Sequence, residues 1–135
     1  MTFNDILHKF RSESFTQKDK GTQFERLMRS WLLSDPRYSN LTKVWLWDDF
    51  PSRADLGGKD TGIDLVARTE EGDYWAIQCK CYKEDSVIDK PAVDSFLATS
   101  SRQFKDPETL QTTSFAKRMW ISTTNHWGKI GRAHV

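Results

Sequence analysis

The sequence predicts an α/β domain in which a mixed β-sheet of about four strands is flanked by helices. Residues 22–33 have the apolar spacing of an amphipathic helix, and 62–67 and 74–82 are β-prone runs separated by a short turn. The connection from the third to the fourth predicted strand, 83–115, is long enough to contain a helix. Such a connection allows parallel strands, whereas a short turn joins antiparallel ones.

Two helices are expected before the first strand. Residues 2–11 have apolar side chains at helical spacing, and 22–33 repeat them over three turns. The polar stretch 12–21 is interpreted as a connector. The second helix is expected to end before Pro36, because the residue that precedes a proline disfavours the helical conformation. Its apolar side is formed by Phe24, Leu27, Met28, Trp31 and Leu32.

Three β-prone runs follow. The first, 41–50, is rich in Val, Leu and Trp, and a glycine-containing loop with a short helical turn near Ala54 comes after it. The second and third runs, 62–67 and 74–82, flank the turn-forming stretch 70–73. These runs predict three strands, of which the last two pair as an antiparallel hairpin.

The rest of the chain predicts one helix and one more strand. A helix is expected over 90–104, because apolar residues recur at helical spacing and a proline falls in the first turn, where a missing N–H is tolerated. Residues 106–113 begin with Asp-Pro and are interpreted as a turn or a short helix. Residues 116–123 predict the fourth strand. No internal repeat interrupts this order.

Length and composition are those of a single domain over 1–135, with its core at about residues 20–125. The chain has 135 residues, of which 37% are hydrophobic and 29% charged, and this composition excludes a disordered segment. Its net charge of +1 gives no overall basic field, so contact with nucleic acid would depend on a local patch. No apolar run approaches the roughly 20 residues of a membrane span.

The two cysteines, Cys79 and Cys81, lie on one predicted strand. Side chains at i and i+2 of a strand point the same way, which places them poorly for a disulfide. The three histidines do not supply the spacing of a zinc site. Two buried thiols and the lack of a secretory leader pattern favour a cytoplasmic protein.

Polar residues at the facing ends of the second and third predicted strands form the candidate site. Asp64 lies in one strand, and Gln78 and Lys80 share one face of the other, because side chains alternate along a strand. If the two strands pair, a carboxylate, an amide and an ammonium converge near one end of the sheet. A metal-binding carboxylate with a nearby lysine indicates phosphodiester chemistry.

The pattern of Asp64 followed by Gln78-x-Lys80 resembles the PD-(D/E)xK nuclease superfamily, specifically its Mrr-like restriction endonuclease branch. In that branch Gln often replaces the last acidic residue of the motif. The stretch 57–64 is similar to the glycine-rich approach to the family's catalytic Asp, and 21–25 resembles the first-helix motif whose Glu joins the metal site. The resemblance covers about residues 20–125 and implies a restriction-endonuclease-like core.

The resemblance also implies a role for each site residue. Asp64 would be the central ligand of Mg²⁺, or of Mn²⁺ in its place, with the Gln78 side-chain oxygen, the Cys79 carbonyl and Glu25 as further ligands. Lys80 would hold or deprotonate the attacking water, or stabilise the charge of the transition state. The predicted catalytic residues are therefore Asp64, Gln78, Lys80 and Glu25.

Structural roles are the alternative for each of these residues. Asp64 would then only satisfy backbone donors at its strand end, and Gln78 and Lys80 would be solvent-facing strand residues. Glu25 would pair with Arg29, one turn further along the helix. A cavity shared by the four polar side chains would separate the two interpretations.

The predicted function is that of a metal-dependent DNA endonuclease domain from a restriction system, acting on double-stranded DNA. Lys83 and Lys90 are expected to contact the DNA backbone. By resemblance, such domains accompany helicase or methyltransferase modules in the same or a partner chain, and 1–135 is consistent with an N-terminal fragment of a larger enzyme. Two alternatives stay open: a catalytically silent DNA-binding or docking module with this fold, and a junction or repair nuclease of the same superfamily.

Overall fold

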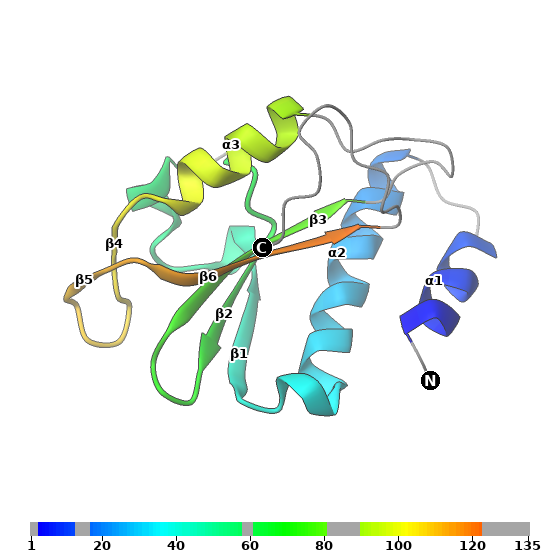
Figure 1. Cartoon of the computed structure of the whole chain (residues 1–135), viewed down its shortest axis with the longest axis horizontal. Helices are drawn as coiled ribbons and strands as arrows, with labels where there is room; N and C mark the ends of the chain where they lie inside the picture. The colour runs from blue at the N-terminus through cyan, green and yellow to red at the C-terminus, as the bar shows by residue number, and fades with distance from the viewer. Residues whose placement is uncertain (1–2, 13–16, 58–60, 81–89, 123–135) are drawn as a thin grey trace.

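The computed structural model describes residues 3–12, 17–57, 61–80 and 90–122. Within these ranges one sheet contains β1 (Leu41–Leu46), β2 (Leu65–Thr69), β3 (Tyr74–Lys80) and β6 (Phe115–Ser122), in the order β1-β2-β3-β6 (Figure 1). β2 is antiparallel to both β1 and β3, whereas β3 and β6 are parallel. The predicted mixed sheet of four strands is confirmed.

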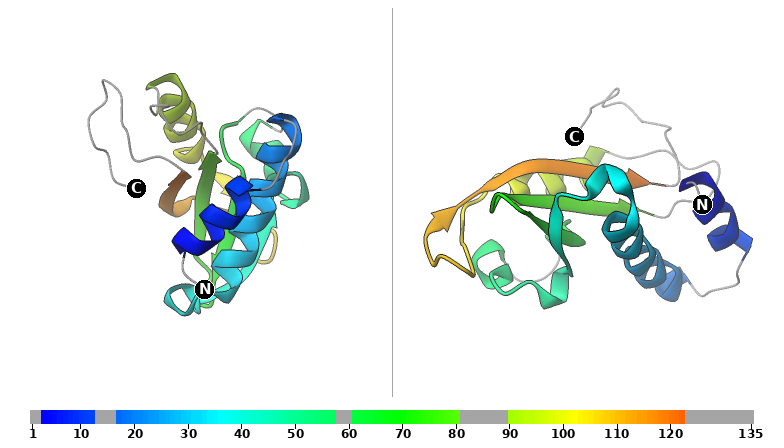
Figure 2. Two further views of the ribbon diagram at one scale, coloured as in Figure 1. Left: turned by 90° about the vertical axis from the view of Figure 1, so that its right-hand side faces the viewer. Right: turned by 90° about the horizontal axis from the view of Figure 1, so that it is seen from below.

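Helices cover both faces of this sheet (Figure 2). α1 (Phe3–Ser12) and α2 (Gln17–Ser34) lie on one face, and α3 (Lys90–Ser100) lies on the other. The connections between described elements include η1 (Pro36–Tyr38), η2 (Trp47–Asp49), η3 (Arg53–Leu56) and a hairpin of β4 (Phe104–Lys105) and β5 (Thr112–Thr113). Among the described residues no helix is long and apolar enough to cross a membrane.

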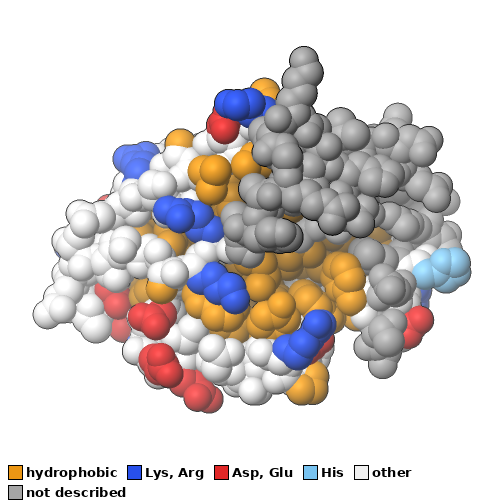
Figure 3. All heavy atoms as spheres, in the orientation of Figure 1, with side chains coloured by type: hydrophobic (Ala, Val, Ile, Leu, Met, Phe, Trp, Pro, Cys, Tyr) orange, Lys and Arg blue, Asp and Glu red, His pale blue; other side chains and the backbone are white. Residues whose placement is uncertain are grey.

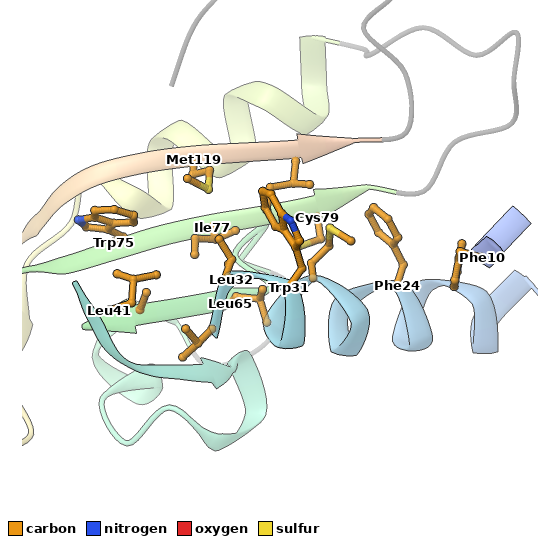
Figure 4. Close-up of a cluster of buried hydrophobic side chains, with 14 residues drawn as sticks. Phe10, Phe24, Trp31, Leu32, Leu41, Leu65, Trp75, Ile77, Cys79 and Met119 are labelled. Atoms are coloured by element: carbon orange, nitrogen blue, oxygen red, sulfur yellow. The ribbon is translucent and has the colours of Figure 1, made fainter. Parts of the chain in front are cut away.

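One hydrophobic cluster fills the space between α2 and the sheet (Figure 4). Met28 and Leu32 of α2 are completely buried, as is Ile77 of β3. Phe10 of α1 packs against Phe24 of α2, with ring centroids 5.5 Å apart. The apolar stripe predicted for this helix is therefore the face that packs on the sheet, and burial of this stripe stabilises the position of α2.

A second cluster, on the α3 side of the sheet, is mainly aromatic. Phe50, Tyr74 and Phe104 pack against one another with ring centroids 5.4 to 6.2 Å apart. The Tyr74 hydroxyl donates a hydrogen bond of 2.8 Å to Asp106 Oδ1, so the polar end of the buried ring is satisfied. Because both clusters include residues of β3, this strand is buried on both faces.

Two helices differ in length from the expectation. α2 begins at Gln17, so the second half of the expected connector 12–21 is helical. α3 ends at Ser100 instead of 104. Beyond that point the Ser101 hydroxyl donates to Leu97 O at 2.6 Å, and such side-chain bonds to the backbone compete with continuation of a helix.

The elements between the helices also differ in part from the expectation. The first strand ends at Leu46, because the chain turns into η2, where Trp47 N donates to Asp64 O at 2.9 Å. The expected helical turn near Ala54 is confirmed as η3. Residues 106–113 do form a turn, but the alternative of a short helix is wrong. This segment closes the β4–β5 hairpin, with Asp106 Oδ1 accepting Glu108 N at 2.8 Å.

Tryptophans are used in packing, and cations cover several of their rings. Trp47 and Trp75 are buried, and Trp45 and Trp120 pack against the second cluster. Lys117 Nζ lies 4.5 Å from the centroid of Trp75. Outside the grey atoms, Figure 3 shows basic side chains among the hydrophobic ones, and most of the acidic side chains gathered at the lower left of this face.

Gly62 lies two residues before Asp64 and in contact with α3. Its φ of 77° is in the left-handed region, which residues with a side chain rarely adopt. A Cβ at this position would lie 3.1 Å from Phe96 N and 3.2 Å from Phe96 Cα. Because these atoms belong to helix backbone, they cannot move aside as the end of a side chain can. A glycine is required here for two separate reasons.

Gly62→Ala is expected to lower the free energy of unfolding by about 2–4 kcal/mol, because backbone strain and the contact with α3 act together. Gly72→Ala is the matched control. Its φ is 90°, but its Cβ would meet only the end of the Arg68 side chain, at 3.4 Å. The control should lose about 1–2 kcal/mol. Urea unfolding measures both losses, and equal losses would contradict a specific role of the α3 contact.

Candidate functional site

A cleft with a volume of about 640 Å³ opens where α2 meets the ends of three strands. Glu25, Asp64, Gln78 and Lys80, the four predicted catalytic residues, all line it. Its remaining lining residues are Thr22, Arg26, Leu46, Trp47, Asp48, Asp49, Thr61, Gly62 and Ile63. The structure therefore brings together the four predicted residues, although Glu25 and Lys80 are 55 positions apart in the sequence.

Strand pairing places Asp64 beside Gln78. In the antiparallel pair of β2 and β3, Leu65 is the partner of Ile77, and continuing this register by one residue sets Asp64 opposite Gln78. Asp64 N donates to Ile77 O at 2.9 Å, and Asp64 O accepts Trp47 N at 2.9 Å. The backbone N–H and C=O of Asp64 are thus both hydrogen-bonded, and these two bonds fix the position from which its side chain extends.

The Asp64 carboxylate is hydrogen-bonded to the backbone of β3. Its Oδ2 accepts a hydrogen bond of 2.8 Å from Cys79 N. Burial raises the pKa of Asp64 from 3.8 to about 6, although the Cys79 hydrogen bond and the charge of Lys80 act in the opposite direction. The structural role considered for Asp64 is real, but a carboxyl group with a raised pKa inside a cleft is also typical of a functional site.

Gln78 is buried, with 2% of its surface exposed, so the alternative of a solvent-facing residue is wrong for it. The sheet face that carries Gln78 is covered by the aromatic cluster and α3. In the part of the chain that the structure describes, Gln78 Oε1 has no hydrogen-bond partner. A buried acceptor without a donor is unfavourable by about 1–3 kcal/mol, and a bound cation would remove this cost.

Glu25 is brought to the cleft by α2 and is half-buried. Burial and the negative charges of Asp64 and Asp48 raise its pKa from 4.5 to about 7, while Lys80 and Arg26 act to lower it. The suggested pairing with Arg29 is not formed. Arg29 Nε instead donates to Val44 O at 2.7 Å and ties α2 to β1.

Lys80 and Cys79 end β3 with side chains on opposite faces. Lys80 lines the cleft, is partly exposed, and acts electrostatically on both Asp64 and Glu25. The Cys79 side chain belongs instead to the hydrophobic cluster under α2, and burial raises the pKa of its thiol well above the usual value. Only the backbone of Cys79 is therefore directed toward the site, through its N–H bond to Asp64.

Of the two predicted DNA contacts, only Lys90 lies in the part of the chain that the structure describes, and it is not among the residues that line the cleft. Lys83 lies outside the described residues. Lys90 is exposed at the start of α3, and its Nζ forms an ion pair of 2.6 Å with Asp94. Contact of these lysines with DNA stays a prediction.

Several cleft residues were missed by the sequence reasoning, in particular Thr22, Arg26, Asp48 and Asp49. Thr22 and Arg26 lie three residues before and one after Glu25, so helical geometry places Thr22 on the same face of α2 and Arg26 next to it. This relation was available from the sequence once Glu25 was assigned to the site. Asp48 and Asp49 lie in η2, and their position depends on how β1 ends.

The donor atoms of the cleft fit a hard cation such as Mg²⁺. Among the described residues there is no group of three or more His, Cys, Asp or Glu side chains placed to hold a metal ion. The lining contains the carboxylates of Glu25, Asp48, Asp49 and Asp64, and the amide oxygen of Gln78, which has no hydrogen-bond partner among the described residues. Mg²⁺ is commonly bound by one or two carboxylates, with water molecules completing its shell.

Without metal, the protein is expected to lose stability as the pH rises from about 4 to about 7. The folded-state pKa values of Asp64 and Glu25, about 6 and about 7, lie above their ordinary values of 3.8 and 4.5. The folded state therefore binds protons more tightly than the unfolded chain. The resulting stabilisation is complete below the unfolded-state pKa values and is lost as the pH rises through 6 and 7.

The loss due to Asp64 should be about 2–3 kcal/mol, and Glu25, which is only half-buried, should add less. Urea unfolding in EDTA at several pH values measures it. Asp64→Asn removes one of the two titrations and should flatten the profile. A stability that increases with pH over this interval would contradict the assigned burial of the two carboxyl groups.

Comparison with known proteins gives two matches. Residues 33–134 match the family model Mrr_cat_2, described as restriction endonuclease, a range that includes Asp64, Gln78 and Lys80 but not Glu25. The chain is also similar to a solved structure titled "ATP-dependent Type ISP restriction-modification enzyme LlaBIII bound to DNA", with 27% sequence identity and a TM-score of 0.63. That similarity covers 98% of this chain but 7% of the other. No curated protein matches the chain.

Proposed function

We propose, because the chain belongs to the restriction endonuclease family whose model matches it, that its cleft hydrolyses phosphodiester bonds of double-stranded DNA with the help of a divalent metal ion. The observation that carries this proposal is the convergence of Glu25, Asp64, Gln78 and Lys80 on one cleft. The four side chains come from α2, from the end of β3 and from Asp64, which lies directly before β2 and not inside the strand as expected. Simple structural roles would not require a shared cavity.

Mg²⁺ or Mn²⁺ would be held by the carboxylates of Asp64 and Glu25, the amide oxygen of Gln78 and, by family resemblance, the carbonyl of Cys79. The unpartnered Gln78 Oε1 supports this assignment, because it is a buried acceptor that a cation would satisfy. When bound, the ion would supply activation of a water molecule and neutralisation of phosphate charge.

The chain's own residues have separate tasks in the proposed reaction. Asp64, whose backbone is bonded to Ile77 and Trp47, keeps its carboxylate in a fixed position at the cleft. Lys80 is the basic residue assigned to the reacting phosphate, because its positive charge acts on the carboxyl groups of both Asp64 and Glu25. Its ammonium would hold the attacking water or stabilise the negative charge that develops on the scissile phosphate.

The restriction-modification enzyme to which the chain is similar is described as bound to DNA and ATP-dependent. This supports DNA as the substrate, and it supports the proposal that helicase or methyltransferase modules act with this domain, in the same or a partner chain. Lys83 and Lys90 would contact the DNA backbone. We also propose a cytoplasmic location, in keeping with the buried, unpaired thiol of Cys79.

Incubation with supercoiled plasmid tests the proposal. Cleavage in Mg²⁺ or Mn²⁺, and its absence in EDTA, is the expected result, and calorimetric titration with Mn²⁺ should detect binding that Asp64→Asn weakens. Duplex binding without cleavage and without metal binding would instead support the catalytically silent module. A strong preference for a four-way junction over linear duplex would support the junction nuclease.

A further inference from the structure

The face of α2 that borders the cleft contains more than Glu25. Thr22 and Arg26 also line the cleft, and these three residues lie within about one and a half helical turns. Arg26 is exposed, and with Lys80 it supplies the positive charge of the lining. The proposed metal ligands and Lys80 leave Arg26 without a task in the reaction.

Arg26 forms no ion pair with an acidic side chain in the part of the chain that the structure describes, whereas the exposed Arg37 beyond the other end of α2 is paired with Asp35 at 3.1 Å. Its charge does act on Glu25, so the guanidinium lies within electrostatic reach of the site. An unpaired guanidinium at the edge of such a cleft has the planar array of donors that matches a phosphate group.

Gly21 gives a second, independent observation. It lies inside α2 and one turn before Glu25, on the same face of the helix. It does not have the positive φ that requires glycine elsewhere in the described chain, and a Cβ built on it would meet no atom of the described residues within 4 Å. A glycine inside a helix is less stable than alanine, so neither its backbone conformation nor its packing against the described residues explains it. It does leave open space beside the cleft.

We propose that the backbone of the DNA strand to be cut crosses α2 at Gly21, and that Arg26 binds the phosphate next to the scissile one. This inference rests on the proposed function of the cleft and assigns its positioning residue. Phosphate contacts of this kind fix the register of DNA on a protein without reading its sequence. Arg26 would therefore place the scissile phosphate opposite Asp64 and Lys80, and Gly21 would leave room for the sugar–phosphate chain.

Binding of a fluorescent duplex in Ca²⁺, measured by anisotropy at several salt concentrations, tests the role of Arg26 apart from cleavage. Arg26→Ala should weaken binding by about tenfold and reduce the slope of log K against log salt by about 1. Arg26→Lys should restore the slope but only part of the affinity, because the charge returns without the paired donors. Arg37→Ala removes the same charge outside the cleft and should bind like the wild type.

Gly21→Gln tests the space beside the helix. Glutamine is a good helix former, so this variant should be at least as stable as the wild type in urea unfolding. It should nevertheless bind the duplex more weakly and show a higher KM with little change in kcat. The proposed path of the strand would be overturned if Gly21→Gln bound the duplex with the affinity of the wild type. It would also be overturned if Arg26→Ala kept the wild-type slope of log K against log salt.

The two proposals fail in different ways. If the wild type does not cut DNA but binds it with the predicted dependence on Arg26, the positioning role stands and the hydrolytic function falls. If the wild type cuts DNA and Arg26→Ala retains its KM and salt slope, the hydrolytic function stands and the positioning role falls. A wild-type protein that binds no duplex overturns the inference about Arg26.

Discussion

Replacing Asp64 with asparagine is expected to lower the rate of DNA cleavage by at least about 100-fold while making the metal-free protein more stable at pH 8. Asparagine keeps an oxygen that can accept the 2.8 Å hydrogen bond from Cys79 N. It removes a buried negative charge, whose burial raises the pKa of Asp64 to about 6. The gain in free energy of unfolding should be about 1–3 kcal/mol.

This combination of lower activity and higher stability separates function from structure, because a residue with only a structural role would lose both or neither. Asp64→Ala is the companion variant. It leaves Cys79 N without its acceptor, so it should lose activity and also lose about 1–2 kcal/mol of stability relative to Asp64→Asn. Plasmid cleavage and urea unfolding on the same preparations give both readouts. If Asp64→Asn cleaved plasmid at the wild-type rate, the assignment of the site to Asp64 would be wrong.

Lys80→Met should lower kcat by about 10²–10⁴-fold with a small effect on KM. Methionine keeps most of the length and apolar stem of lysine but lacks the ammonium, which is the group that acts on Asp64 and Glu25 in the cleft. The fold should persist, because Lys80 is partly exposed at the end of β3. Single-turnover cleavage rates at saturating protein measure the chemical step directly.

Lys105→Met is the matched control, since Lys105 is an exposed lysine of the β4–β5 hairpin, which packs near Tyr74 at the other end of β3. It should cut DNA at the wild-type rate. Lys80→Arg distinguishes the two roles of the ammonium. Recovery of activity would indicate charge stabilisation, whereas a rate as low as that of Lys80→Met would indicate proton transfer. Equal rates for Lys80→Met and the wild type would remove Lys80 from the mechanism.

Local patterns in the sequence predicted the elements that carry the site. The alternation of side chains in β3 set Gln78 and Lys80 on one face, and the turn residues at 70–73 joined this strand to the one that follows Asp64. The helical spacing of apolar residues predicted which face of α2 packs on the sheet. Such features depend on neighbours within a few residues, so they can be read without knowledge of the fold.

The start of α2 and the hairpin of β4 and β5 were not predicted, because their signals are weak or nonlocal. Residues 17–20 are polar and include no apolar repeat, and they become helical as an extension of a packed helix. Residues 106–113 contain an Asp-Pro turn that fits several structures. Contact of Phe104 with Tyr74 and the bond from Tyr74 to Asp106 stabilise the hairpin against the alternatives.

By itself the sequence determined the approximate positions of the four strands of the main sheet, the turn between β2 and β3 and the order of the polar residues along them, because side-chain alternation and turn chemistry are properties of short segments. Only the tertiary structure decided that Glu25 and Arg26 reach the same cleft as Asp64, and that the Gln78 side of β3 is buried. Those outcomes depend on α2 packing on one face of the sheet and α3 on the other. Contacts between distant segments bring them about, and no short stretch of sequence encodes such contacts.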